Sequence, residues 1–222
     1  MTKHFHNELE KIKKMILSLG ATVEERVHLA IESILNNQIE LAQKVIDTDY
    51  EIDALEVEVE EEILKVMALY QPVAVDLRFL VAVLKINNEL ERIGDQAVNI
   101  AQRMKVLAKE PQAEFFFDYS QMADITKSML KKSLDALVNI DVKLAADILK
   151  LDDEVDRLRS EAYDIIKRVI AEKPKQAGFL INLLLVSRHL ERLADHTTNI
   201  AEEVIYMVEG EIVRHGKLVT GA

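Results

Sequence analysis

Cysteine is absent from this sequence of 222 residues, and its absence excludes several kinds of site. Disulfide bonds, thiolate nucleophiles, and zinc or iron–sulfur centres held by thiolates all require cysteine. Residues that interrupt helices are scarce, because the chain has only three prolines and six glycines. Aromatic residues make up 5% of the chain, whereas good helix formers are abundant. The composition therefore favours a protein built from long helices.

An excess of positive charge is also lacking. The net charge is −11, which argues against a general nucleic-acid binder, because neutralising phosphate groups requires a basic surface. The N-terminal segment MTKHFHNELEKIKK has no apolar core followed by a cleavage site, so we expect no secretory signal. The longest apolar stretches, residues 79–84 and 179–186, are shorter than the roughly 20 residues that cross a bilayer. We therefore expect a cytoplasmic protein that does not bind nucleic acid.

Apolar residues recur at three- and four-residue steps along most of the chain, which is the period of an amphipathic helix. Pro72, Pro111 and Pro174 fall where these runs are interrupted, so each is expected to mark a joint. Gly210 is expected to end the last helix. The pattern predicts an all-α fold of six long antiparallel helices, over residues 3–37, 39–70, 74–108, 116–139, 142–172 and 176–209.

The second half of the sequence repeats the first. Residues 78–101 match residues 178–201 at an offset of 100, and residues 42–55 match residues 145–158 at an offset of 103. A period of this length is longer than that of solenoid repeats, so it predicts two tandem three-helix bundles. We place them at residues 1–110 and 111–222, with Pro111 and the following FFFDYS segment as the hinge.

Acidic residues recur at four-residue steps on two helices of each repeat. With about 100° per residue, Glu91, Asp95 and Asn99 form a stripe at the border of an apolar face. The helix before it carries the pair D-x-x-x-D. In the first repeat this pair is Asp49 and Asp53. In the second repeat the pair is Asp152 and Asp156, and the stripe is Glu191, Asp195 and Asn199.

These stripes leave two interpretations open. If antiparallel helices present them to each other, four carboxylates converge, which is unfavourable unless protons or cations compensate. Carboxylate and amide oxygens without sulfur suit hard cations such as Mg, Mn, Fe or Ca, so the first interpretation is a metal site in each bundle. The second is a solvated acidic helix face, for which Glu-x-x-x-Asp is also typical.

Histidines offer weaker candidates. Glu25 and His28 have the spacing of a di-iron ligand pair, but the counterpart of His28 in the second repeat is Lys131. His189 and His196 border the second acid stripe, as auxiliary ligands or as ordinary border residues. The sequence shows no glycine-rich phosphate loop, no G-x-S-x-G motif and no dinucleotide-binding fingerprint. We therefore expect no enzyme and no organic cofactor, with a di-metal oxidase or hydrolase and a purely structural scaffold as alternatives.

Three motifs together resemble the PhoU family. They are the duplicated E-R-[IL]-[GA]-D-x-x-x-N-I-A, the upstream D-x-E-[IV]-D, and Y-Q-P-V-A-x-D-L-R at residues 70–78. The resemblance covers nearly the whole chain and implies a duplicated three-helix bundle. It implies a negative regulator of phosphate uptake and of the phosphate-starvation response, which links the ATPase complex of the phosphate ABC transporter to a sensor histidine kinase. Such a protein is peripheral to the membrane through its partners and is expected to form a homodimer.

The resemblance also implies multinuclear metal clusters of ions such as Fe, Zn, Mn or Mg. By position, the ligands in this chain would be Asp49, Asp53, Glu91, Asp95 and Asn99, then Asp152, Asp156, Glu191, Asp195 and Asn199. The two repeats differ beside these positions, since Arg159 and Tyr163 stand where the first repeat has Glu56 and Glu60. This departure puts an equal metal content of the two sites in doubt.

Overall fold

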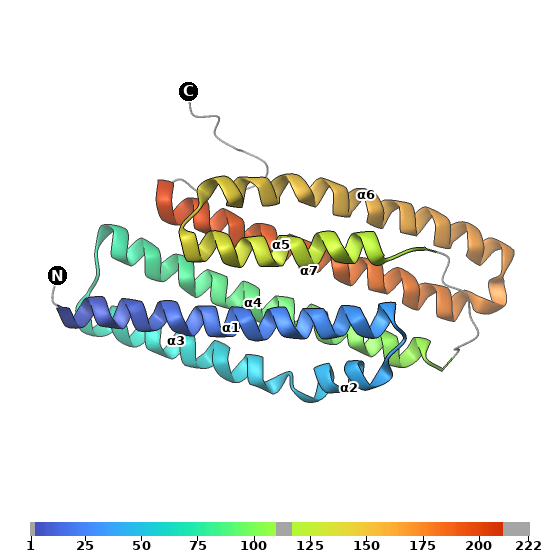
Figure 1. Ribbon diagram of the computed structural model, residues 1–222, viewed down its shortest axis with the longest axis horizontal. Helices are drawn as coiled ribbons and strands as arrows, with labels where there is room; N and C mark the ends of the chain where they lie inside the picture. The colour runs from blue at the N-terminus through green and yellow to red at the C-terminus, as the bar shows by residue number, and fades with distance from the viewer. Residues whose placement is uncertain (1–2, 110–116, 211–222) are drawn as a thin grey trace, which may run out of the picture.

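The computed structural model describes residues 3–109 and 117–210. Every regular element within these residues is helical, which confirms the all-α prediction (Figure 1). The elements are α1 (Lys3–Leu35), α2 (Ile39–Asp47), α3 (Tyr50–Tyr70), α4 (Ala74–Leu107), α5 (Ser120–Asn139), α6 (Val142–Glu172), the short 3-10 helix η1 (Pro174–Gln176) and α7 (Ala177–Glu209). Gly210 ends α7 in the left-handed conformation, with φ of 75°, as its position predicts.

The helix expected over residues 39–70 is divided into α2 and α3, which corrects that prediction. The break lies at Thr48 and Asp49, where the Thr48 hydroxyl donates to the carbonyl of Lys44 at 2.8 Å. Hydroxyl and carboxylate side chains compete with the helix for backbone groups, so such a pair favours a turn. The counterpart of Thr48 in the second repeat is Leu151, and α6 continues through it without a break.

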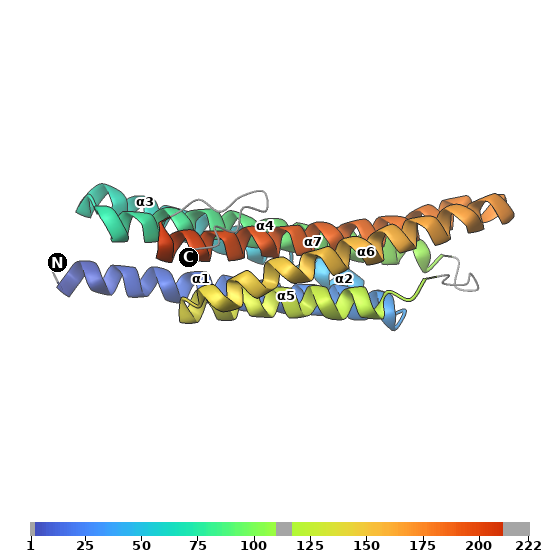
Figure 2. The same ribbon diagram turned by 90° about the horizontal axis from the view of Figure 1, so that it is seen from above.

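Four long helices lie side by side in one layer. Figures 1 and 2 show α4 and α7 in the middle of it, with α3 outside α4 and α6 outside α7. The helices α1 and α5 form a second layer against the first, and they also contact each other (Figure 2). The antiparallel pair of α4 and α7 makes the most extensive interface between helices. The two predicted bundles therefore pack against each other along their length.

One continuous hydrophobic core runs through both repeats. Tyr119 fixes the start of the second repeat, because its buried hydroxyl donates to the carbonyl of Leu183 at 2.7 Å. The boundary predicted at residues 110 and 111, and Pro111 as the hinge, lie outside the described residues, so they stay predictions. Among the helices of residues 3–109 and 117–210, none is long and apolar enough to cross a membrane.

Candidate functional site

The first acid stripe lies where α3 and α4 pack closely. Gly94 makes this approach possible, since a Cβ atom at that position would lie 2.9 Å from the Cδ1 of Ile52. The buried Asn87 on α4 donates from Nδ2 to the carbonyl oxygen of Glu56 on α3 at 2.9 Å. Together these contacts set the register of the two helices. They bring Asp49, which directly precedes α3, and Asp53 in the first turn of α3 beside the part of α4 that carries Glu91 and Asp95.

The pKa values of these carboxyl groups reflect their burial and the negative charge of their acidic neighbours. Burial raises the pKa of Asp49, and the charges of Asp53 and Asp95 raise it further, against a lowering by Arg26. Burial likewise raises the pKa of Glu91, with Asp95 and Asp53 adding to the effect. Acids from two different helices therefore repel one another in one seam, which we call the first acid seam. Asp49 and Glu91 are half-buried in it, and Asp53 and Asp95 are exposed.

The second acid seam lies between α6 and α7. Burial raises the pKa of Asp152 to about 6, and the charges of Asp195 and Asp156 contribute. The pKa of Asp195 is raised by burial and by Asp156, and that of Glu191 by burial and by Asp195. The acids that the sequence aligns across the duplication are thus grouped in the same way in both repeats.

Arg92 and Arg192 stand at equivalent positions beside the two acid seams, but the further arginines come from different elements. In the first repeat Arg26 on α1 is 5% exposed and forms an ion pair with Glu51 of α3. Methionine stands at the equivalent position of the second repeat, residue 129. There Arg159 of α6 lowers the pKa of Glu191 instead. The two seams are therefore equal in acidic residues and unequal in how their charge is balanced.

The donors of these seams fit a hard cation by their chemistry, since they are carboxylate oxygens in a partly water-excluded place. The repulsion among these acids, which the arginines only partly offset, is a second argument, because a bound cation would compensate it. As the side chains stand, however, residues 3–109 and 117–210 contain no group of three or more His, Asp and Glu arranged to hold a metal ion. Metal binding would thus require the carboxylates of each seam to turn toward one another.

The side chains of Asn199, His196 and His189 contact α4 and not the acids of the second seam. Asn199 donates from Nδ2 to Oε2 of Glu89 on α4 at 3.0 Å. His196 contacts the same oxygen of Glu89 through Nδ1 at 2.7 Å. His189 places its Nδ1 3.0 Å from Oε1 of Gln96. All three side chains therefore contact α4 across the interface between the repeats, while Asn99 on α4 is half-buried.

These contacts form a ladder along α4 and α7. Its members recur every seven residues, at 89, 96 and 103 on α4 and at 182, 189 and 196 on α7. The last step is a hydrogen bond from Arg103 to Asn182 at 3.1 Å, and Lys85 pairs with Glu203 at 3.0 Å beyond the other end. Position 89 contacts position 196, which is the counterpart of 96, and position 96 contacts position 189, which is the counterpart of 89. The repeats are thus related by an approximate two-fold axis, and the offset-100 alignment was the signal that could have predicted these pairs.

The two crosswise pairs differ in charge. Burial alone would raise the pKa of Glu89, but hydrogen bonds from His196 and Asn199 outweigh it and lower that pKa. Burial lowers the pKa of His189 to about 4, and the charges of Arg103, Arg192 and Arg188 add to the shift. His189 is therefore neutral near pH 7 and donates from Nδ1 to Gln96. One pair is anionic on its carboxylate side, and the other is uncharged.

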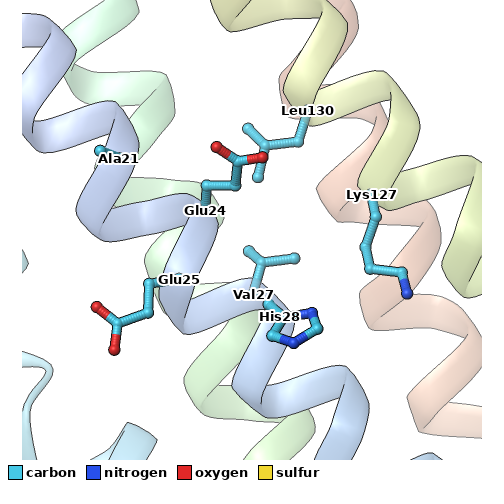
Figure 3. Close-up of a pocket in the computed structure, with 7 residues that line it drawn as sticks. All are labelled: Ala21, Glu24, Glu25, Val27, His28, Lys127 and Leu130. Carbon is cyan, nitrogen blue, oxygen red and sulfur yellow. The ribbon is translucent and has the colours of Figure 1, made fainter.

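Glu25 and His28 do not converge on a shared site. Both lie on α1 at a groove of about 360 Å³ between α1 and α5, which Lys127 and Leu130 line from the α5 side (Figure 3). In Figure 3 the carboxylate of Glu25 points away from His28. It lies 3.3 Å from Nζ of Lys44 and 3.4 Å from Nη1 of Arg26. This arrangement does not favour the di-iron ligand pair considered from their spacing.

Comparisons with known proteins place this fold in context. The sequence model of the PhoU domain matches the chain twice, over residues 16–104 and 119–204. The phosphate-specific transport system accessory protein PhoU homolog of Aquifex aeolicus (strain VF5) is 38% identical over 208 residues, which is 94% of each chain. The PhoU homolog 1 of Thermotoga maritima is 34% identical over 94% of this chain and 90% of its own.

Solved structures agree with these sequence matches. The crystal structure of PhoU from Pseudomonas aeruginosa superposes with a TM-score of 0.89 at 33% identity, covering 93% of this chain and all of the other. The phosphate transport system regulatory protein PhoU from Streptococcus pneumoniae gives a TM-score of 0.85 at 29% identity, over 95% of this chain and all of its own. The similarity extends over nearly the whole described fold.

Proposed function

Because this chain belongs to the PhoU family, we propose that it is an accessory protein of a phosphate-specific transport system and a negative regulator of phosphate uptake. The observation that carries the proposal is the double match of the PhoU domain, whose two ranges include every residue of both acid seams. Relatives of similar length are named as accessory proteins of phosphate transport. Regulation of the same process is the simplest role for a chain that shares their whole fold.

The proposed partners are proteins. The chain acts in the cytoplasm as a homodimer, peripheral to the membrane, on the ATPase complex of the phosphate ABC transporter. It also contacts a sensor histidine kinase and keeps the phosphate-starvation response repressed when phosphate is plentiful. The motifs shared with the family support this proposal, and long helical surfaces suit a protein that works by contact.

The regulatory role is tested by deleting the gene. We expect phosphate-responsive genes to become active in high phosphate, and a plasmid copy of the gene to restore repression. Phosphate uptake, measured with labelled phosphate, should rise in the same deletion strain. Unchanged repression and unchanged uptake in the deletion strain would contradict the proposal.

Each acid seam is proposed to bind metal ions in a multinuclear site of Fe, Zn, Mn or Mg. Support comes from the pKa values of Asp49, Glu91, Asp152 and Asp195, which burial raises and neighbouring carboxylates raise further, so a bound cation would relieve the repulsion among them. The bound ions would supply positive charge between α3 and α4 and between α6 and α7. Their role is structural or regulatory, and no reaction is assigned to them.

The metal proposal is tested by elemental analysis of protein purified without chelator. The wild-type chain should carry metal, and the double variant Glu91→Gln/Asp195→Asn should carry much less. Equally low metal in both proteins would leave the acid seams as solvated faces. Turnover of peroxide or of an ester by the metal-loaded chain, abolished in Asp95→Ala, would instead favour the alternative of a di-metal enzyme.

A further inference from the structure

The helix α3 has two apolar faces, and one of them is uncovered. Ile52, Val59 and Ile63 are buried, on the side that packs against α1 and α4. On the opposite side, apolar side chains that face solvent occupy five of the six positions at three- and four-residue steps, and Glu61 occupies the remaining one. We call this row the α3 stripe; it consists of Tyr50, Ala54, Val57, Leu64 and Ala68. Tyr50 is 66% exposed, and Val57 and Leu64 are each 50% exposed, so the row is open along most of the helix.

The second repeat provides an internal comparison, because α6 has the equivalent place beside α7. Val57 corresponds there to Ser160 and Leu64 to Lys167, and both are exposed. Tyr50 and Ala54 correspond to Asp153 and Arg157, of which the latter bonds to two glutamates of its own helix. The fold therefore does not require apolar residues on this face. The α3 stripe is a property of the first repeat that its duplicate lacks.

Apolar exposure continues past the end of α3. Leu69 near the end of α3 is 67% exposed, Val73 in the connection to α4 is 73% exposed, and Val75 in the first turn of α4 is 62% exposed. Exposed apolar surface of this extent marks an interaction site.

The borders of the α3 stripe are acidic. The helix α3 contains seven acidic residues and a single basic one, Lys65. With about 100° per residue, four of the acids border the stripe or lie within it. These are Asp53, Glu58, Glu60 and Glu61. Lys65, which pairs with Glu62, is the basic residue at the border. None of the four takes part in an ion pair within residues 3–109 and 117–210, whereas Glu62 at the covered side pairs with Lys11 and Lys65.

This charge selects among the possible occupants of the stripe. A second copy of α3 would bring acids against acids, and like charges across an interface oppose association. An anionic membrane surface would be repelled for the same reason. A helix with its own apolar row and basic borders would satisfy both features of the face at once. From this complementarity we infer that the α3 stripe is the docking site for a basic amphipathic helix of a partner protein.

The partner helix has definite properties. The 21 residues of α3 correspond to a length of about 30 Å at 1.5 Å per residue, so the matching segment has roughly 20 residues. Its apolar residues recur at three- and four-residue steps, and lysine or arginine stands at the bordering positions. The inference rests on the proposed function and deepens it, because it names the surface through which the regulator holds a partner.

The first test measures binding of a probe peptide. The probe is a synthetic fluorescent helix of 21 residues with leucine at the a and d positions of its heptads and lysine or arginine at e and g. Val57→Ser/Leu64→Lys gives α3 the residues that α6 has at the same places, and Ser160→Ala/Lys167→Ala is the matched control on α6. Circular dichroism checks that each variant folds. We expect the wild type and the control to bind equally, and the α3 variant to bind at least tenfold more weakly.

Charge and alternative occupants are tested with the same proteins. A peptide with glutamate in place of the basic residues should not bind, and raised salt should weaken binding of the basic peptide. Equal binding of both peptides, or equal binding by the α3 variant, would overturn the inference. So would a change from dimer to monomer in that variant by light scattering, which would assign the stripe to a second copy. Binding to phosphatidylglycerol vesicles that only the α3 variant loses would assign it to a membrane.

The second test separates this inference from the proposed function. Each variant replaces the gene in the chromosome, and phosphate-responsive expression is measured in high phosphate at equal protein abundance. We expect repression to be lost in Val57→Ser/Leu64→Lys and kept in Ser160→Ala/Lys167→Ala. If deletion of the gene relieves repression but the α3 variant represses normally, the inference fails and the proposed function stands. If deletion changes nothing, the proposed function fails, and the peptide measurement decides the inference.

Discussion

The pKa of Asp152 reflects both the burial of its carboxyl group and the acidic neighbours in the second acid seam. Its carboxyl is half-buried, and its acidic neighbours belong both to its own helix and to α7, so its pKa is raised to about 6. The ordinary value of 3.8 applies in the unfolded chain. The folded protein therefore holds this proton to a higher pH than the unfolded chain does. The contribution of this group to the free energy of unfolding falls as the pH rises from about 4 to about 6, and the ionised group destabilises the fold to its full extent at neutral pH.

We predict that Asp152→Asn stabilises the metal-free protein at pH 7.5 and not at pH 4. The expected gain is about 1 kcal/mol, after allowing for the solvent that screens a half-exposed carboxyl. Urea unfolding of chelator-treated protein at the two pH values measures it. Asp164→Asn, at an exposed position of the same helix, is the control and should change little at either pH. A loss of stability at pH 7.5 in Asp152→Asn would contradict the prediction.

His189 allows a second prediction at the same scale. Its pKa of about 4 follows from burial and from three neighbouring arginines, with an uncharged partner in Gln96. Gln96→Glu gives this pair the carboxylate that Glu89 supplies to His196, so the pKa of His189 should rise by at least one unit. Proton NMR of the imidazole ring during a pH titration measures the change. An unchanged titration of His189 in a folded Gln96→Glu variant would show that the contact is absent in solution.

At the scale of elements, the contact of α3 with α4 and that of α6 with α7 use side chains of different sizes, and the two size differences compensate each other. Gly94 faces Ile52 in the first repeat, and Ala194 and Val155 stand at the equivalent positions of the second. The larger side chain on one helix is thus matched by the smaller one on the other. In both repeats the sum of volumes is nearly kept, as close packing of a core requires.

This pairing predicts the outcome of a double-mutant cycle. Gly94→Ala gains helix propensity, but its Cβ meets the Cδ1 of Ile52, so its net effect on the free energy of unfolding is small. Ile52→Val alone should cost about 1 kcal/mol, because it removes a buried methylene group. The double variant should be more stable than the sum of the two by about 1 kcal/mol. Strictly additive effects in urea unfolding would show that the two side chains are not in contact.

Much of the arrangement of elements was predictable from the sequence, and the exceptions have local causes. The period of apolar residues and the positions of Pro72 and Pro174 place most helix limits within a few residues. The break at Thr48 was missed because apolar periodicity continues across it, while the competing hydroxyl acts on the backbone. The grouping of the acids into two seams follows from their spacing at the border of the apolar face.

The contacts of the residues near the second acid stripe were not predictable in the same way. A helical projection gives the side of the helix on which His189, His196 and Asn199 lie, but it does not say which neighbouring helix covers that side. Packing of the two repeats against each other decides it, and α4 rather than α6 receives these side chains. Whether the acid seams hold metal stays a prediction, because it depends on carboxylate rotamers and on ions.

At the scale of the whole molecule, the two repeats share one hydrophobic core along α4 and α7. We therefore predict that they unfold together in a single transition. The natural chain has no tryptophan, so Tyr70→Trp and Tyr206→Trp each place one fluorescent probe, the first beside α1 and the second on α7. Unfolding in urea should give the same midpoint for both probes and for circular dichroism. Separate midpoints would mean that the halves are independent folding units.

The approximate two-fold axis between α4 and α7 has a further consequence. In a dimer of identical chains, every substitution at the interface is made twice, so both ends of the interface always change together. Here the two sides are joined in one chain, and each position can change alone. Glu89 with His196 at one end and Gln96 with His189 at the other are the result. Because both sides belong to one chain, the two ends of the contact can differ from each other, as the outer helices α3 and α6 also do.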